Sequence, residues 1–171
     1  YTAGHQRRVA ELAKAIAMEL GLSEDETHGI YLAAIVHDIG KINVPAEILV
    51  KPSTLSDLEY QMVKHHVLAS YEILKGIQFP WPIAEMVRQH HERLDGSGYP
   101  LGSSGGEILF GSRILAVADV VEAMASHRPY RAGLGIEVAL NEIEKGRAIY
   151  FDTEIVDACL KLFREDGYKL A

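Results

Sequence analysis

The sequence predicts an all-α domain, a single helical bundle, and three observations lead to that prediction. Apolar residues recur every three or four positions in several separate segments, which is the period of a helix with one buried face. Two segments open with a serine followed three residues later by glutamate, the order of a helix-capping box. No stretch alternates apolar and polar residues over a useful length, as a half-buried strand would. At 171 residues, we expect one domain with one core.

The composition is that of an ordinary globular protein, with 48% hydrophobic and 24% charged residues. The formal net charge of -7 argues against a broad basic surface, so we expect neither a nucleic acid polymer nor a membrane as a partner of this domain. Any polyanionic ligand therefore needs a local positive site. The single cysteine, Cys159, excludes an internal disulfide, and neither a signal peptide nor a membrane-length apolar run is found. A cytoplasmic location fits best.

Residues 3–20 form the first expected helix, because Val9, Ile16 and their apolar neighbours recur at helical spacing and Gly21 follows as a stop signal. His5 lies in the first turn and shares the inward face with Val9. A lone histidine at such a place is more often a surface or capping residue than a ligand. Since the helical pattern starts almost at once, we expect this chain to be part of a longer protein.

The second expected helix carries the segment around which the sequence is organised. Ser23 and Glu26 form a capping box at its start, and an apolar run leads to His37. His37 and Asp38 place an imidazole beside a carboxylate, and Gly40 ends the helix. Burying both groups requires a partner, and a divalent metal suits both. A capping histidine paired with its neighbour is the alternative, and the dyad alone does not decide between the two.

A second capping box, Ser56 with Glu59, starts a helix that we expect to run through Leu74. This helix carries two adjacent histidines, His65 and His66. The apolar residues of the helix are spaced so that His66, rather than His65, faces the core.

A shorter helix, from about Pro82, delivers His90 and His91 to its end. Adjacent side chains on a helix diverge by about 100°, so the two histidines can converge on one centre only where the helix unwinds or at its edge. The glycine-rich loop that follows, to Gly106, is typical of a binding loop or lid, although glycine-rich linkers look the same. Tyr99 in its middle offers an aromatic face to a ligand.

Residues 109–125 form another apolar helix, which contains Asp119. A carboxylate buried in that setting must be paired, protonated or bound to metal. Two further helices, 136–146 and 153–165, show apolar periodicity without obvious chemistry, and we expect them to close the bundle.

Three cations are candidates for phosphate binding. Lys41 follows the histidine–aspartate dyad, and Pro45 keeps the chain after it out of helical geometry. Arg128 and Arg131 lie in a turn beyond the helix 109–125, and two arginines can bind phosphate in a bidentate manner. Solvated loop lysines and surface ion pairs are the ordinary alternatives for these residues.

Seven nitrogen and oxygen donors lie in contexts predicted to be buried, and they are His5, His37, Asp38, His66, His90, His91 and Asp119. Seven donors exceed the needs of one metal ion, and Asp38 can bridge two ions through its two oxygens. Two ions roughly 3.5–4 Å apart activate a bridging hydroxide and support in-line displacement at phosphorus. A phosphodiesterase or phosphomonoesterase is therefore favoured over a dioxygen-activating site, which would use more carboxylates.

The sequence resembles the HD-GYP family, the metal phosphohydrolases of bacteria that degrade cyclic dinucleotide messengers. The resemblance covers essentially the whole chain and is carried by the motifs HQRRV, HDIGK, VKHHVLASYEIL, HHERLDGSGYP, ADVVEAM and SHRPYR. It implies a helical bundle of the HD-domain type with a long GYP loop. It also implies metal ligation by the same seven residues, with iron or manganese as the metal.

The resemblance further implies roles for the cations and for the loop tyrosine. Lys41, Arg128 and Arg131 are expected to contact the phosphate or guanine groups, and Tyr99 to shape the pocket. Some family members carry a glutamate four residues before the first histidine, where it helps bind a third metal. This chain has Tyr1 there, so we expect two metal ions.

The family pattern leads to a specific hypothesis. One ion is held by His5, His37, Asp38 and Asp119, and the other by Asp38, His66, His90 and His91. A bridging hydroxide attacks phosphorus and opens cyclic di-GMP to linear pGpG, with further cleavage to GMP left open. The alternatives are a non-catalytic receptor for a cyclic dinucleotide and a hydrolase of another cyclic dinucleotide, such as cyclic GMP-AMP. Family habit implies a sensory region upstream, and homodimerisation is open.

Overall fold

The structure is a computed structural model and describes residues 2–127 and 132–171. Tyr1, Arg128 and Arg131 lie outside the described residues. The helices in chain order are α1 Thr2–Glu19, α2 Glu24–Val36, η1 Ile39–Asn43, α3 Ala46–Leu49, α4 Asp57–Lys64, α5 His66–Leu74, α6 Ile83–Arg88, η2 Gly105–Glu107, α7 Phe110–Ala125, α8 Ile136–Lys145 and α9 Thr153–Arg164, where η marks a 3₁₀ helix. Within the described part of the chain, the only β-type pairing is an isolated bridge, so the all-α prediction is confirmed.

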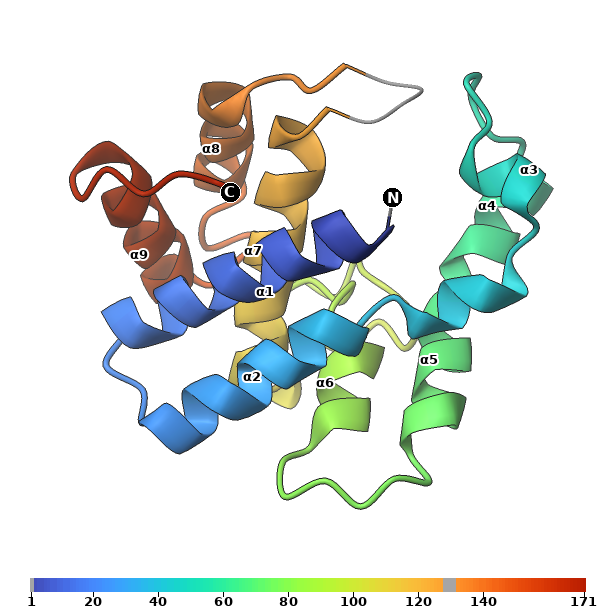
Figure 1. Cartoon of the computed structure of the whole chain (residues 1–171), viewed down its shortest axis with the longest axis horizontal. Helices are drawn as coiled ribbons and strands as arrows, with labels where there is room; N and C mark the ends of the chain where they lie inside the picture. Colours follow the sequence, from blue (N-terminus) through green and yellow to red (C-terminus); the bar gives the residue numbers. More distant parts are fainter. Residues whose placement is uncertain (1, 128–131) are drawn as a thin grey trace.

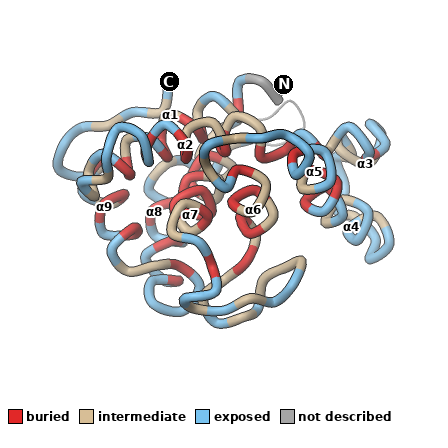
Figure 2. The backbone as a smooth tube through the Cα atoms, turned by 90° about the horizontal axis from the view of Figure 1, so that it is seen from below, coloured by how far each residue is buried: buried red, intermediate tan, exposed pale blue. Residues whose placement is uncertain are grey.

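The centre of the bundle is the packing of α1 against α2 and α7 (Figure 1). Val9, Leu12 and Ile16 of α1 and Ile114 and Leu115 of α7 are wholly buried. Each such side chain stabilises the fold by roughly 1.5–3 kcal/mol through the removal of apolar surface from water. Figure 2 shows the buried residues concentrated on the sides of α1, α2, α6 and α7 that face one another. This core fixes how α1 and α7 cross, and both helices carry candidate ligands.

Two groups of helices flank this centre (Figure 1). α8 and α9 pack against α7 and α1 and close the bundle, as predicted. α5 and α6 pack against each other, and α6 also contacts α2. α3 and α4 lie at the end of the molecule opposite α9. None of the helices in the described ranges has the length and apolar character needed to cross a membrane.

Both predicted capping boxes are confirmed. Ser23 Oγ accepts a hydrogen bond from the Glu26 amide at 3.1 Å, and Glu26 Oε2 accepts one from the Ser23 amide at 3.0 Å. Ser56 and Glu59 form the same reciprocal pair at 3.3 and 2.8 Å. Each N-cap contributes about 1 kcal/mol. These caps set where α2 and α4 begin.

The prediction of one continuous helix over 57–74 is wrong, because the helix breaks at His65 between α4 and α5. His66 Nδ1 lies 2.5 Å from the carbonyl oxygen of Val63. The imidazole therefore uses a carbonyl oxygen that would otherwise accept a hydrogen bond from a backbone amide of the helix. Insertion of a side chain into the backbone ladder is a known cause of a helix break. The orientation of the two histidines is confirmed, since His66 is buried and His65 is exposed.

The segment after the dyad also contains more helix than predicted. It forms the 3₁₀ helix η1 and the single turn α3, with Val44 between them. Val44 is extended, with φ -97° and ψ 130°, because it precedes Pro45.

Candidate metal centre

The structure brings all seven predicted ligands together from five parts of the chain. His5 is on α1, His37 and Asp38 follow α2, His66 begins α5, His90 and His91 follow α6, and Asp119 is on α7. His90 and His91 lie where α6 has already ended, so neighbouring side chains point to the same region. Helix ends are suited to this task because their backbone geometry changes within one or two residues.

The donor atoms fall into two compact groups joined by a third. The groups are His5, His37 and Asp119; His66, His90 and His91; and His37, Asp38 and His90, and within each group one donor atom per residue lies within 4.8 Å of the others. Such clusters of imidazole and carboxylate suit borderline divalent cations such as iron, manganese and zinc.

Asp38 lies between the two outer groups. Its Oδ2 is 3.6 Å from His5 Nε2 and 3.4 Å from His37 Nε2. Its Oδ1 is 3.2 Å from His66 Nε2. The two oxygens of one carboxylate therefore face different sets of histidines, which is the arrangement of a carboxylate that bridges two ions.

Three of the histidines share one orientation. In each, Nδ1 hydrogen-bonds the backbone carbonyl of the residue three positions earlier, which fixes the ring and turns Nε2 inward. The pairs are His37 with Ala34 at 2.6 Å, His66 with Val63 at 2.5 Å, and His90 with Val87 at 2.5 Å. The three Nε2 atoms are buried and have no hydrogen-bond partner in the described structure. Leaving a buried polar atom without a partner costs about 1–3 kcal/mol, so these inward lone pairs fit metal ligation.

The protonation states of the side chains in the centre also suit metal ligation. Burial acts to raise the pKa of Asp38 and of Asp119, but the neighbouring histidines, His37 above all, outweigh it, and both pKa values lie well below their ordinary range. Burial, aided by nearby positive charge, lowers the pKa of His90 well below normal and that of His91 to about 3. The carboxylates are therefore ionised and these two imidazoles neutral at pH 7, which are the protonation states that bind metal.

His5 and His37 differ from His90 and His91, because nearby carboxylates raise their pKa values against the effect of burial. Hydrogen bonds to Asp119 and Glu122 raise the pKa of His5 to about 9. A metal ion bound on this side of the centre would therefore displace a proton from His5.

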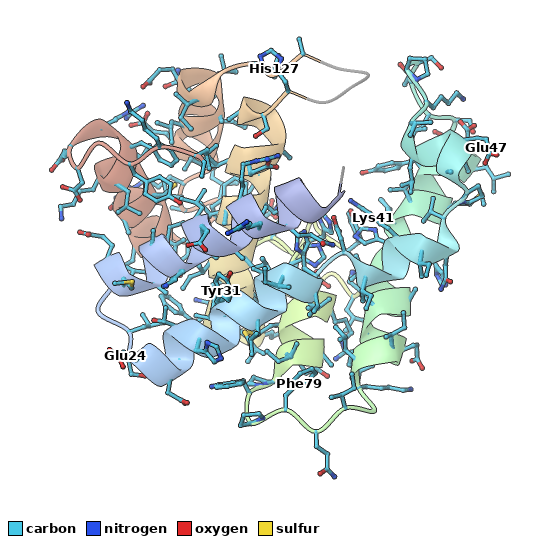
Figure 3. The ribbon with its side chains drawn as sticks, viewed as in Figure 1. Glu24, Tyr31, Lys41, Glu47, Phe79 and His127 are labelled. Carbon is cyan, nitrogen blue, oxygen red and sulfur yellow. The ribbon has the colours of Figure 1, made fainter. Side chains whose placement is uncertain are left out.

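Lys41 is part of η1 and lies at the edge of the centre (Figure 3). Its Nζ is 2.7 Å from Asp38 Oδ2, and its side chain is 24% exposed, so a cation stands between the ligand cluster and solvent. The other predicted phosphate contacts, Arg128 and Arg131, lie outside the described residues.

The glycine-rich loop packs tightly against the ligands. The Tyr99 ring stacks on the His91 ring, with centroids 4.8 Å apart and planes 15° apart, and the Tyr99 amide donates to the His91 carbonyl at 3.2 Å. A Cβ on Gly98 would meet the His91 carbonyl oxygen at 2.3 Å, so the backbones touch. Glu92 Oε1 accepts a hydrogen bond from the Leu101 amide at 2.7 Å and anchors the loop further.

Two residues of the centre were missed by the sequence analysis. Glu122 is wholly buried and pairs with His5 Nδ1 and with Arg8. Its position one turn after Asp119, in the same apolar run, is the signal that could have found it. Ser70 Oγ accepts from the Gly40 amide at 2.8 Å, and nothing in the local sequence indicates this contact.

Comparison with known proteins agrees with this geometry. A family model described as an HD domain matches residues 2–155. The cyclic di-GMP phosphodiesterase response regulator RpfG of Xanthomonas campestris pv. campestris is 41% identical over 162 residues, which cover 94% of this chain and 43% of that protein. The 3'3'-cGAMP-specific phosphodiesterase 1 of Vibrio cholerae is 39% identical over 165 residues, covering 94% of this chain and 38% of that protein.

The fold also has relatives among solved structures. Bd1817, an HDG"Y"P protein from Bdellovibrio bacteriovorus, matches with a TM-score of 0.79 at 17% identity, over 95% of this chain and 52% of that one. At that identity the likeness shows the fold alone. The chain spans less than half the length of the curated relatives described above.

This chain is a helical bundle that holds a cluster of histidines and aspartates between its helices. These two features are those of a class of helical domains that bind metal ions. The chain belongs to the HD domain family, in the HD-GYP group that its motifs resemble.

Proposed function

We propose that this domain is a metal-dependent phosphodiesterase that hydrolyses a cyclic dinucleotide, with cyclic di-GMP as the favoured substrate and linear pGpG as the first product. One observation carries the proposal: Asp38 presents its two oxygens to two separate groups of histidine ligands. Such a bridging carboxylate is expected in a two-metal centre, and two-metal centres are suited to displacement at phosphorus.

The seven ligands would hold two divalent ions, which we propose to be iron or manganese. His5, His37 and Asp119 form one side, His66, His90 and His91 form the other, and Asp38 joins them. When bound, the ions supply Lewis-acid stabilisation of the phosphoryl oxygens and lower the pKa of a water molecule.

The residues around the ligands bind and orient the substrate in this proposal. Lys41 presents its ammonium at the exposed edge of the centre, where a phosphoryl oxygen of an incoming ligand would lie. Tyr99, held flat against His91, forms a fixed aromatic wall of the pocket. Arg128 and Arg131 are proposed to contact the phosphate or guanine groups on the basis of the sequence motif alone.

The names of two relatives support a second candidate substrate. One relative at 39% identity is named as specific for 3'3'-cGAMP, while another at 41% is named for cyclic di-GMP. Hydrolysis of cyclic GMP-AMP is therefore the main alternative. A non-catalytic receptor is less favoured, because binding alone does not require a complete set of inward-facing ligands.

We place the domain in the cytoplasm, downstream of a sensory region, as its resemblance to bacterial signalling enzymes implies. The relative named as a response regulator supports an upstream input region. Homodimerisation is open, and size-exclusion chromatography with light scattering would measure it.

The test of the function is a substrate panel. Protein purified without oxygen and loaded with iron or manganese is incubated separately with cyclic di-GMP, 3'3'-cGAMP and cyclic di-AMP, and products are separated by chromatography. We expect linear pGpG from cyclic di-GMP as the fastest reaction. Faster hydrolysis of 3'3'-cGAMP would transfer the proposal to that substrate, and binding of the dinucleotides without any hydrolysis by the loaded protein would favour a receptor.

A further inference from the structure

His5 is held in a different way from the other three oriented histidines of the centre. The Nδ1 atoms of His37, His66 and His90 all face backbone carbonyls. The Nδ1 atom of His5 instead faces a side-chain carboxylate, Glu122 Oε2. A carboxylate partner carries a full negative charge, so it holds the Nδ1–H tautomer and strengthens the donor at Nε2 more than a neutral carbonyl does.

Glu122 is positioned by the same helix packing that forms the core. It lies on α7 one turn after Asp119, and its residue exposure is 0%. A carboxylate buried in this way needs compensation for both of its oxygens. Oε2 bonds His5, and Oε1 accepts from Arg8 Nε at 2.8 Å and lies 2.7 Å from Arg8 Nη2.

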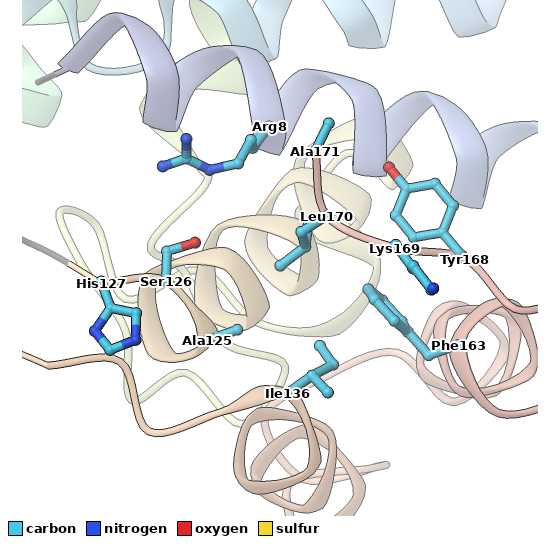
Figure 4. Close-up of a pocket in the computed structure, with 10 residues that line it drawn as sticks. All are labelled: Arg8, Ala125, Ser126, His127, Ile136, Phe163, Tyr168, Lys169, Leu170 and Ala171. Atoms are coloured by element: carbon cyan, nitrogen blue, oxygen red, sulfur yellow. The ribbon is translucent and has the colours of Figure 1, made fainter.

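Arg8 completes a charged chain from solvent to the centre. It lies one turn after His5 on α1, and its side chain is 29% exposed. Arg8 lines a pocket of about 470 Å³ together with Ser126 and His127. Figure 4 shows the Arg8 guanidinium on the same side of this pocket as these two residues. Water therefore has access to the arginine end of the chain, whereas the glutamate end is sealed.

We infer that Glu122 is a positioning residue for His5, that Arg8 acts through Glu122, and that only one half of the metal centre depends on them. The dependent half is the group His5, His37 and Asp119. The half formed by His66, His90 and His91 has no contact with Glu122 or Arg8 among the interactions of the described residues. This inference rests on the metal centre of the proposed function but not on hydrolysis.

The test measures metal binding alone, with Mn²⁺ titrated into the metal-stripped protein without oxygen and free ion followed by electron paramagnetic resonance. Wild type is expected to bind two ions. Glu122→Gln keeps the size of the side chain and removes its charge, so it should weaken one binding class about 10–100-fold and leave the other unchanged. Arg8→Met should weaken the same class by a smaller factor, because water can replace the arginine. The double variant should match Glu122→Gln, since Arg8 acts through Glu122.

The matched control is Asp157→Asn, which also removes an acid bonded to an arginine. Asp157 Oδ1 accepts from Arg147 Nε at 2.7 Å on the exposed surface, so its loss should leave both binding classes as in wild type. Circular dichroism melting of each metal-stripped variant separates positioning from folding. If Glu122→Gln does not fold, the Arg8→Met variant decides, and unchanged binding in it contradicts the inference.

A folded Glu122→Gln variant that binds both ions as tightly as wild type, or loses both classes equally, would overturn the inference. Suppose that wild type binds two ions and Glu122→Gln weakens only one binding class, while loaded wild type hydrolyses no cyclic dinucleotide. That result would support the inference and reject the proposed function. If wild type binds one ion and Glu122→Gln weakens it, the positioning role stands and the two-metal account fails. If that single ion is unaffected, the positioning role fails as well.

Discussion

The Gly40 amide donates a hydrogen bond to Ser70 Oγ at 2.8 Å, and this contact joins α5 to the turn that carries the dyad. Ser70 Oγ also lies 3.3 Å from the His37 carbonyl oxygen. A Cβ built on Gly40 would meet the His66 carbonyl oxygen at 2.1 Å and the Ser70 amide at 2.5 Å. The backbones on the two sides of the metal centre therefore touch at a point where only glycine fits.

Gly40→Ala is expected to separate these two backbones. Forcing a methyl group into this contact should destabilise the fold by about 1–3 kcal/mol, the usual range for an overpacked site, and reduce metal content. Denaturant unfolding and metal analysis of the same sample measure both effects. Gly76→Ala is the matched control, since a Cβ there meets nothing within 4 Å. Wild-type stability and metal content in Gly40→Ala would show that the turn yields easily.

The fold was largely predictable because its signals are local. The capping boxes at Ser23 and Ser56 and the apolar spacing of each segment act within a few residues, and both boxes are confirmed. The break at His65 was missed because it depends on a bond from the His66 side chain to the backbone, which spacing does not reveal.

The ligands of the candidate site were predictable from the sequence, but the residues that hold these ligands in place were not. The ligands follow a recognisable motif, and all of them except Asp119 lie at or next to a helix end, so their types and spacing indicate their chemistry. The partners of the ligands depend on how distant segments cross. Glu122 reaches His5 only because α1 packs across α7, and Ser70 reaches Gly40 only because α5 lies against η1.

Lys41→Met should retain two metal ions and lose turnover by about 10²-fold, the typical effect of removing one electrostatic contact to a reacting group. Metal analysis and the rate of pGpG formation separate these two quantities. Lys51→Met is the matched control, because Lys51 Nζ pairs with Glu59 Oε2 at 2.7 Å instead of with a ligand of the centre. Unchanged turnover in Lys41→Met would remove Lys41 from the mechanism.

Cys159 is expected to be chemically inert in the folded protein. It is buried, and burial raises the pKa of its thiol to about 12, so the reactive thiolate is scarce at pH 8. A chromogenic disulfide reagent should therefore label the native protein very slowly and the guanidinium-unfolded protein at once. Rapid stoichiometric labelling of the native state would contradict the burial of α9 against the core.

The most direct test of the central claim is Asp38→Ala, with metal content and hydrolysis of cyclic di-GMP measured on the same oxygen-free sample. Asp38 faces both ligand groups through its two oxygens, so we expect this variant to lose metal from the centre and to show no detectable turnover. Wild type prepared in parallel should hold about two iron or manganese ions per chain and form linear product. Full metal content together with full turnover in Asp38→Ala would contradict the account.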